Sequence, residues 1–208
     1  MPLGVPPVPT STNTTKISMK QAFAANCPAC GALDKPEAGV RGIALSVGLK
    51  KNPEFWTKMA TLQAKSTNNE ERDQLLYALG GHQDKTTLEQ WVATCLDGSL
   101  PSQEWGTLFA GLSSNNFHDG LAWDLLVKHW DVVYREWGQS QFRMKGIVSD
   151  AMSACKDPSV AKKFFEDHPC DVAKLTIRQQ LESMTANKQL EEASSAAEGC
   201  AQQLLTEF

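Results

Sequence analysis

The sequence predicts an all-α protein, an irregular HEAT-like α-solenoid of stacked antiparallel helix hairpins. Apolar residues recur three, four or seven positions apart in successive segments, a spacing typical of amphipathic helices. Glycine, asparagine or proline bounds these segments, and such residues are common at helix ends. Successive segments pair into units of roughly 30 to 37 residues, the size at which helical repeats bury a continuous core by stacking.

Composition agrees with one folded helical domain. The chain has 208 residues, of which 41% are apolar, and its six Trp and eight Phe supply bulky core side chains. No segment shows the sustained two-residue alternation of a half-buried strand. Because no sequence motif repeats between the hairpins, a globular helix bundle is the alternative architecture.

The expected helices follow one another along the whole chain after residue 40. Three of them begin beside Pro53, Pro101 and Pro158, since proline suits a first helical turn. Glycines follow two further apolar stripes, Gly80-Gly81 after Leu75–Leu79 and Gly98 after Leu88–Leu96. Besides these two stripes, helices are expected at 40–50, 53–65, 102–112, 121–137, 141–155, 158–167 and 171–206.

The most informative segment is 111–130, a polar turn followed by a helix. Apolar residues from Leu121 to Trp137 form one broad stripe, which predicts a single long helix over 121–137. Asn115 and Asn116 are expected to cap its start, and Gly138 to end it.

The N-terminal region divides into two parts before the helical domain 40–208. Residues 1–20 are rich in Pro, Thr and Ser and predict an extended tail without a signal-peptide core. Residues 21–39 form a divergent segment with a CxxC motif. No arginine precedes Arg41, which argues against a mitochondrial presequence. We therefore expect a cytoplasmic protein, or an organellar one if a presequence was removed.

Residues that carry chemistry are sparse. Cys27 and Cys30 resemble half a zinc ribbon or a redox pair; structural thiols, a local disulfide and metal or redox chemistry are the open alternatives. The acidic pairs Asp119/Asp124 and Asp150/Glu166 fit solvated helix faces better than a carboxylate dyad. Four histidines stand alone, without the His-x-x-x-His spacing of a helical zinc site: His82, His118, His129 and His168.

Charge also limits the possible partners. The formal net charge is −4, and the basic residues are scattered rather than clustered. We expect no direct nucleic-acid binding and no membrane contact. We also expect no catalytic residue, no cofactor and no metal ligands in this chain.

Several stretches together resemble a known family. They are Val40-Arg41-Gly42, Val47–Lys50, Leu75–Gly80, Gly111–Trp130 with its Gly-Leu-Ala-Trp-Asp core, Lys163–Pro169 and Thr176–Gln180. In this order they resemble the C-terminal helical domain of zinc aminopeptidases, the family of the puromycin-sensitive, endoplasmic-reticulum and membrane alanyl enzymes. The puromycin-sensitive subgroup is the most similar. The structural signature residues are Gly111, Asn115, Gly120, Ala122, Trp123, Trp130, Phe164 and Phe165.

The resemblance implies a bowl of HEAT-like hairpins that covers a separate catalytic domain. In that family the zinc ligands, the glutamate base and the exopeptidase motif lie in the catalytic domain, and no such motif occurs here. Gln103-Glu104 keeps the family's amide–acid pair without its arginine, and Ser194–Gly199 weakens the last helical stripe. The N-terminal tail suggests a divergent or truncated protein.

Three functions are compatible with these features. The first is a non-catalytic scaffold or adaptor that binds protein partners in a larger complex, or forms a homo-oligomer. The second is a chamber-forming subunit of a split zinc aminopeptidase, with the zinc on another chain. In that case Arg41, Lys50, Arg72 and Lys128 are candidates for contacting a peptide carboxylate. The third is a small zinc or redox protein that acts through Cys27 and Cys30.

Overall fold

The described part of the chain is all-α. The structure is a computed structural model that describes residues 45, 47–48 and 54–206, and it contains no strand within these residues. The expected helix at 40–50, the tail 1–20 and the CxxC segment lie wholly or largely outside them. The helices are α3 (Phe55–Lys65), α4 (Asn69–Leu79), α5 (Lys85–Thr94), α6 (Trp105–Ser113), α7 (Leu121–Lys128), α8 (Trp130–Trp137), α9 (Gln141–Ala154), α10 (Pro158–Asp167) and α11 (Lys174–Thr206).

Local sequence explains where many of these helices begin and end. The side chains of Asn68, Asp84 and Asp157 each accept a hydrogen bond from a backbone N–H in the first turn of α4, α5 and α10. Pro158 occupies the first position of α10, as expected. α5 runs into a π-type turn, Cys95–Ser99, in which Gly98 takes a φ of 107° that disfavours other residues.

The prediction of one helix over 121–137 is wrong. The segment forms two helices, α7 and α8, which meet at His129, where the backbone leaves the helical region (φ −112°, ψ 18°). His129 N–H donates to the Leu125 carbonyl, 3.1 Å away, and the Val133 N–H donates to the His129 carbonyl at 3.1 Å. The apolar stripe therefore continues across a bend. The apolar periodicity did not reveal the bend because the buried residues of both helices belong to the same cluster.

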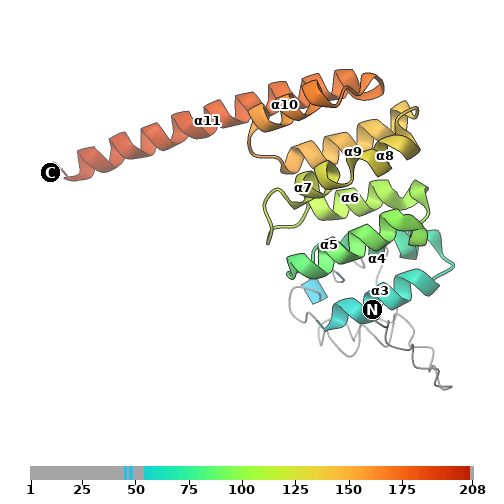
Figure 1. Ribbon diagram of the computed structural model, residues 1–208. Helices are drawn as coiled ribbons and strands as arrows, with labels where there is room; N and C mark the ends of the chain where they lie inside the picture. Colours follow the sequence, from blue (N-terminus) through green and yellow to red (C-terminus); the bar gives the residue numbers. More distant parts are fainter. Residues whose placement is uncertain (1–44, 46, 49–53, 207–208) are drawn as a thin grey trace, which may run out of the picture.

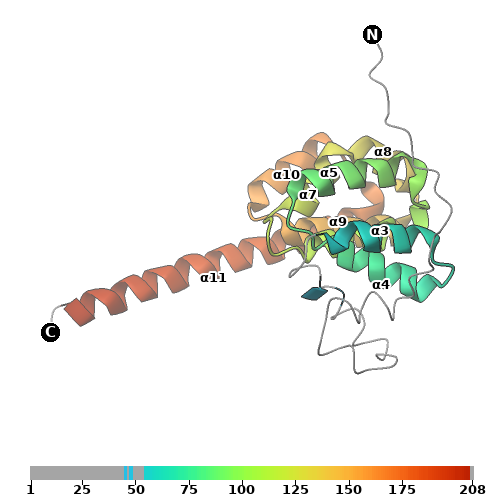
Figure 2. The same cartoon turned by 90° about the horizontal axis from the view of Figure 1, so that it is seen from below.

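Successive helices pair and then stack (Figure 1). α3 packs on α4, α4 on α6, α6 on α9, and α9 on α11. The second helices of the successive pairs, α4, α6, α9 and α11, thus form one continuous layer. Figure 2 shows α5, α8 and α10 along one side of the stack and α4 and α9 along the other. The classification of this arrangement as a HEAT-like solenoid stays a prediction.

The described core consists of two apolar clusters of unequal size. The smaller lies between α3 and α4 and includes Leu45, Phe55, Met59, Leu75 and Leu79. The larger extends from Leu76 on α4 through α5 to α10 and on to Met184 on α11. The partly buried Trp91 of α5 packs against both. The first hairpin thus has an apolar cluster of its own, while Leu76 of α4 belongs to the larger cluster and α4 packs closely on α6.

The last helix is much longer than the others. α11 has 33 residues, which corresponds to a length of about 50 Å at 1.5 Å per residue. Its first half lies along α9 and α10, and its second half projects beyond them in both views (Figures 1 and 2). Among the described residues, no helix combines the length and the apolar character that a membrane span requires.

Candidate functional site: the signature residues and the α11 overhang

Gly111 lies where α6 crosses α4 with their backbones in contact. A Cβ atom added to Gly111 would lie 3.0 Å from Cα of Tyr77 and closer still to its carbonyl oxygen. A Cβ atom on Gly80, at the end of α4, would lie 2.5 Å from the Gly111 carbonyl carbon. Only glycine at both positions permits this approach, so Gly111 sets the spacing between the first two hairpins.

Asn115 does not cap α7, contrary to the prediction from its position. Its Nδ2 donates to the carbonyl oxygens of Gly80, at 2.8 Å, and His82, at 2.9 Å, in the α4–α5 loop. Its Oδ1 accepts from the backbone N–H groups of Phe117, at 2.8 Å, and His118, at 3.2 Å. The buried amide therefore clamps two loops together, a tertiary role that the local sequence does not encode.

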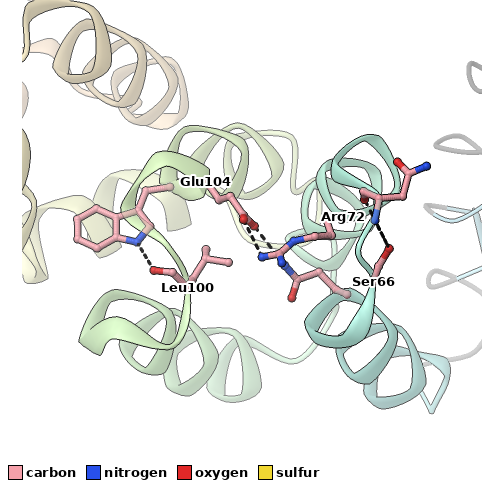
Figure 3. A network of polar contacts seen from close by, with 7 residues as sticks. Ser66, Arg72, Leu100 and Glu104 are labelled. Carbon is pink, nitrogen blue, oxygen red and sulfur yellow. Dashed lines mark hydrogen bonds and ion pairs between the residues drawn. The ribbon is translucent and has the colours of Figure 1, made fainter.

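An ion pair joins α4 to the short 3-10 turn before α6 (Figure 3). Arg72 Nη2 lies 2.6 Å from Glu104 Oε1, with side chains 23% and 15% exposed, and Gln63 Nε2 donates to Glu104 Oε2 at 3.5 Å. Trp105 Nε1 donates to the Leu100 carbonyl beside it. Arg72, a candidate for binding a peptide carboxylate, is thus committed to a carboxylate within this chain. Glu104, the acid of the Gln103-Glu104 pair, is its partner.

Gly120 and Ala122 shape the start of α7. Gly120 has a φ of 81°, in the left-handed region, and its carbonyl accepts from the N–H of Asp124 at 2.9 Å. Ala122 is fully buried in the larger cluster. Both residues therefore serve the fold.

The four aromatic signature residues meet at one junction, where α7 and α8 pack on α10. Trp123 makes edge-on contacts with Phe164 and Phe165, with ring centroids 5.4 and 6.0 Å apart. Trp130 contacts the same two rings at 5.3 and 5.6 Å. Tyr134 stacks on Trp130 from outside the junction. The sequence predicted these residues as structural, and they form one packed cluster in which three rings are buried and Phe164 is partly buried.

The cysteines that the structure describes as buried are poor nucleophiles. Burial, with a smaller contribution from the Glu104 carboxylate, raises the pKa of Cys95 to about 12. Burial also raises the pKa values of Cys155 and Cys170, and all three thiols are free. These thiols therefore stay protonated at neutral pH. Cys27 and Cys30 lie outside the described residues.

Three other polar candidates are paired on the surface. Lys128 lies 3.7 Å from Glu89, Asp124 lies 3.6 Å from Lys85, and Asp119 lies 2.6 Å from Lys156. Across 54–206 and the described residues before them, no three His, Cys, Asp or Glu side chains converge in a way that could hold a metal ion. Arg41 and Lys50 lie outside the described residues.

The end of α11 is a feature that the sequence did not single out as a site. Among the α11 residues whose exposure is described, Met184 is the last buried one, and Lys188 still forms an ion pair with Asp157 at 3.7 Å. We call residues 189–206 the overhang, and the described helices up to residue 188 the stack. The overhang spans about 27 Å, and its described side chains, residues 189–195 and 197, are all exposed. Leu190 is 67% exposed.

One family model matches the chain. It is described as the ERAP1-like C-terminal domain and covers residues 18–186. The match includes every signature residue and ends within α11, just before the overhang. No curated protein matches the chain.

Proposed function

Because the chain belongs to the family of ERAP1-like C-terminal domains, we propose that it is a helical scaffold that holds protein partners in a larger assembly. The observation that carries this proposal is the overhang. It extends α11 beyond the matched domain, and each of its described side chains is exposed. A helix of this length has marginal stability by itself in water. A partner that covers the overhang would therefore stabilise a helix that is already formed but has little support of its own.

The stack supports the same interpretation. Several of its signature residues are engaged in contacts between helices, as with Gly111 against Tyr77 and Trp130 against Phe164. Its partly buried arginine pairs with Glu104 within the chain. The stack thus supplies a rigid base, and the overhang supplies the docking element.

The alternative is a chamber-forming subunit of a split zinc aminopeptidase. The family match favours it, because an aminopeptidase-derived domain has an evolutionary partner in the catalytic domain. In that case the zinc and the general base come from another chain, and this chain shapes the space for the peptide. We rank it second because Arg72 and Lys128, the two described candidates for contacting a peptide carboxylate, each pair with an acidic residue of this chain.

Purification from the native source under mild conditions tests both functions. The full chain and a variant ending at Lys188 carry the same N-terminal tag, and the mass of each purified complex is measured by native mass spectrometry. We expect a larger assembly with the full chain and loss of a stoichiometric partner with the shortened chain. Equal retention of all partners would contradict a docking role for the overhang.

An activity assay on the same eluates separates the two functions. Hydrolysis of an aminoacyl substrate that a zinc chelator abolishes, together with a partner carrying a zinc-peptidase motif, would establish the split enzyme. The scaffold predicts neither. The full chain found as a free monomer of 22.8 kDa would contradict both functions.

A further inference from the structure

The α4–α5 loop, residues 80–84, is held on one side by α3. Trp56 Nε1 donates to the carbonyl of Leu79, 3.1 Å away, at the start of the loop. The His82 ring stacks on Trp56 with ring centroids 5.3 Å apart and an interplanar angle of 27°. Trp91 of α5 meets the same Trp56 ring edge-on. The loop therefore attaches α3 to the second hairpin through His82.

On the other side, the loop is held by residues 115–118. Asn115 donates to the carbonyls of Gly80 and His82, as described above. Nε2 of His118 lies 2.6 Å from the carbonyl oxygen of Gln83, to which the ring nitrogen donates. Two histidines, one on each loop, thus take part in the contact between the first hairpin and the rest of the stack.

His82 is the buried member of this pair. The residue is only 6% exposed, and its Nδ1 has no hydrogen-bond partner. The neutral ring avoids an unpaired donor when its proton is on Nε2, whereas the protonated ring has an N–H on Nδ1 with no acceptor and a positive charge in a buried site. The closed arrangement therefore favours the neutral ring.

The charged groups around His82 act in opposite directions. Burial makes the largest contribution and lowers the pKa of His82 below its usual value of 6.5. Asp84, which caps α5, opposes this effect, whereas the charge of protonated His118 adds to it. From α3 the ring faces the uncharged Trp56. Acidification adds charge to the ring without supplying a partner for it.

We propose that these two loops form a proton-sensitive latch, in which protonation of His82 loosens α3 from the α4–α5 loop and so from the rest of the stack. α4 stays packed on α6 where Gly80 meets Gly111, whereas α3 packs mainly on α4 and contacts α5 through Trp56, so α3 is able to open locally. The latch adds a response to acidic surroundings that the scaffold function does not require.

The sign of the effect follows from the lowered pKa. Well above pH 6.5 the ring is neutral in both the closed and the open latch, so the closed state keeps its full stability. As the pH falls from 6.5 toward the lower pKa of the closed state, the open latch binds the proton more readily. The opening constant of α3 then rises by about tenfold for each unit by which the two pKa values differ.

Hydrogen exchange of the full chain tests the latch. Exchange is followed by mass spectrometry at pH 7.5 and 5.5, with each rate corrected for the intrinsic effect of pH on amide exchange. We expect the opening constant of residues 55–65 to rise at pH 5.5 in the native chain and to be independent of pH in His82→Phe, which keeps a ring against Trp56. His82→Gln is a second non-titrating variant with the same expected behaviour.

The exposed His168 provides the matched control, and His168→Phe should behave like the native chain. Three results would overturn the latch. One is an α3 opening constant that does not change with pH in the native chain. The second is an equal rise in α3 and in α9, which would indicate global acid unfolding. The third is a rise in the α3 opening constant that persists in both His82 variants.

Discussion

The stack and the overhang belong to one chain but are held by different forces. In the stack, helices touch through glycine backbones, a buried amide clamp and aromatic rings, as at Gly111, Asn115 and Trp130. In the overhang, every described side chain is exposed to solvent. The difference teaches that stability resides in the stack and that the overhang is free to serve another purpose. Substitutions in the two regions should therefore have very different effects.

The largest loss of stability is expected for Trp130→Ala. The change empties the centre of the aromatic junction, where Trp130 contacts Phe164 and Phe165. The free energy of unfolding should fall by about 3–5 kcal/mol, since the cavity cannot close between three helices. Chemical denaturation followed by circular dichroism measures it. Phe142→Ala is the control, because that ring is 90% exposed and its removal should change the free energy by less than about 0.5 kcal/mol.

Gly111→Ala should have the next largest effect. The added methyl group meets the backbone of Tyr77, so α6 and α4 must move apart at a cost of about 1–3 kcal/mol in unfolding free energy. Gly106→Ala on the same helix has no atom within 4 Å of the new Cβ and should stabilise the protein by about 0.5–1 kcal/mol. Equal melting temperatures for the two variants would show that the glycine contact does not set the helix spacing.

Asn115→Ala should destabilise the contact between the two loops. The carbonyls of Gly80 and His82 lose their donor while they remain close to the core, which costs about 1–3 kcal/mol in unfolding free energy. Thermal unfolding by calorimetry checks this value. The exposed neighbour Asn116 gives the matched variant, Asn116→Ala, which should unfold like the native chain. A loss of unfolding free energy of similar size in both variants would show that it comes from the turn that contains both residues and not from the hydrogen bonds of Asn115.

The smallest effect is expected for removal of the overhang. A chain that ends at Lys188 keeps every residue of the described core, so its free energy of unfolding should change by less than about 0.5 kcal/mol. A clear drop in melting temperature would mean that the overhang supports the stack, and the comparison between the two regions would fail.

Local patterns in the sequence predicted most of the helices. Asp157-Pro158 begins α10 and Gly98 ends the turn after α5, because these residues act on their own backbone. The apolar stripe from Leu121 to Trp137 was identified correctly as buried, but its bend at His129 was not. A bend that keeps the same face inward leaves the apolar period unchanged.

Tertiary contacts between distant residues were not predictable in the same way. Asn115 looked like a helix cap, yet its amide reaches carbonyls more than thirty positions earlier in the chain. The pairing of Arg72 with Glu104 likewise depends on how α4 and α6 cross. The aromatic cluster around Trp130 was predicted as structural from the family resemblance, and only the structure showed that its four members meet at one junction.

The measurement that tests the scaffold function most directly is hydrogen exchange of the overhang in two states. Residues 189–206 are followed in the isolated chain and in the assembly purified from the native source. The account predicts fast exchange in the isolated chain, as for a helix without tertiary support, and strong protection in the assembly. Equal exchange in both states would contradict a docking role for the overhang.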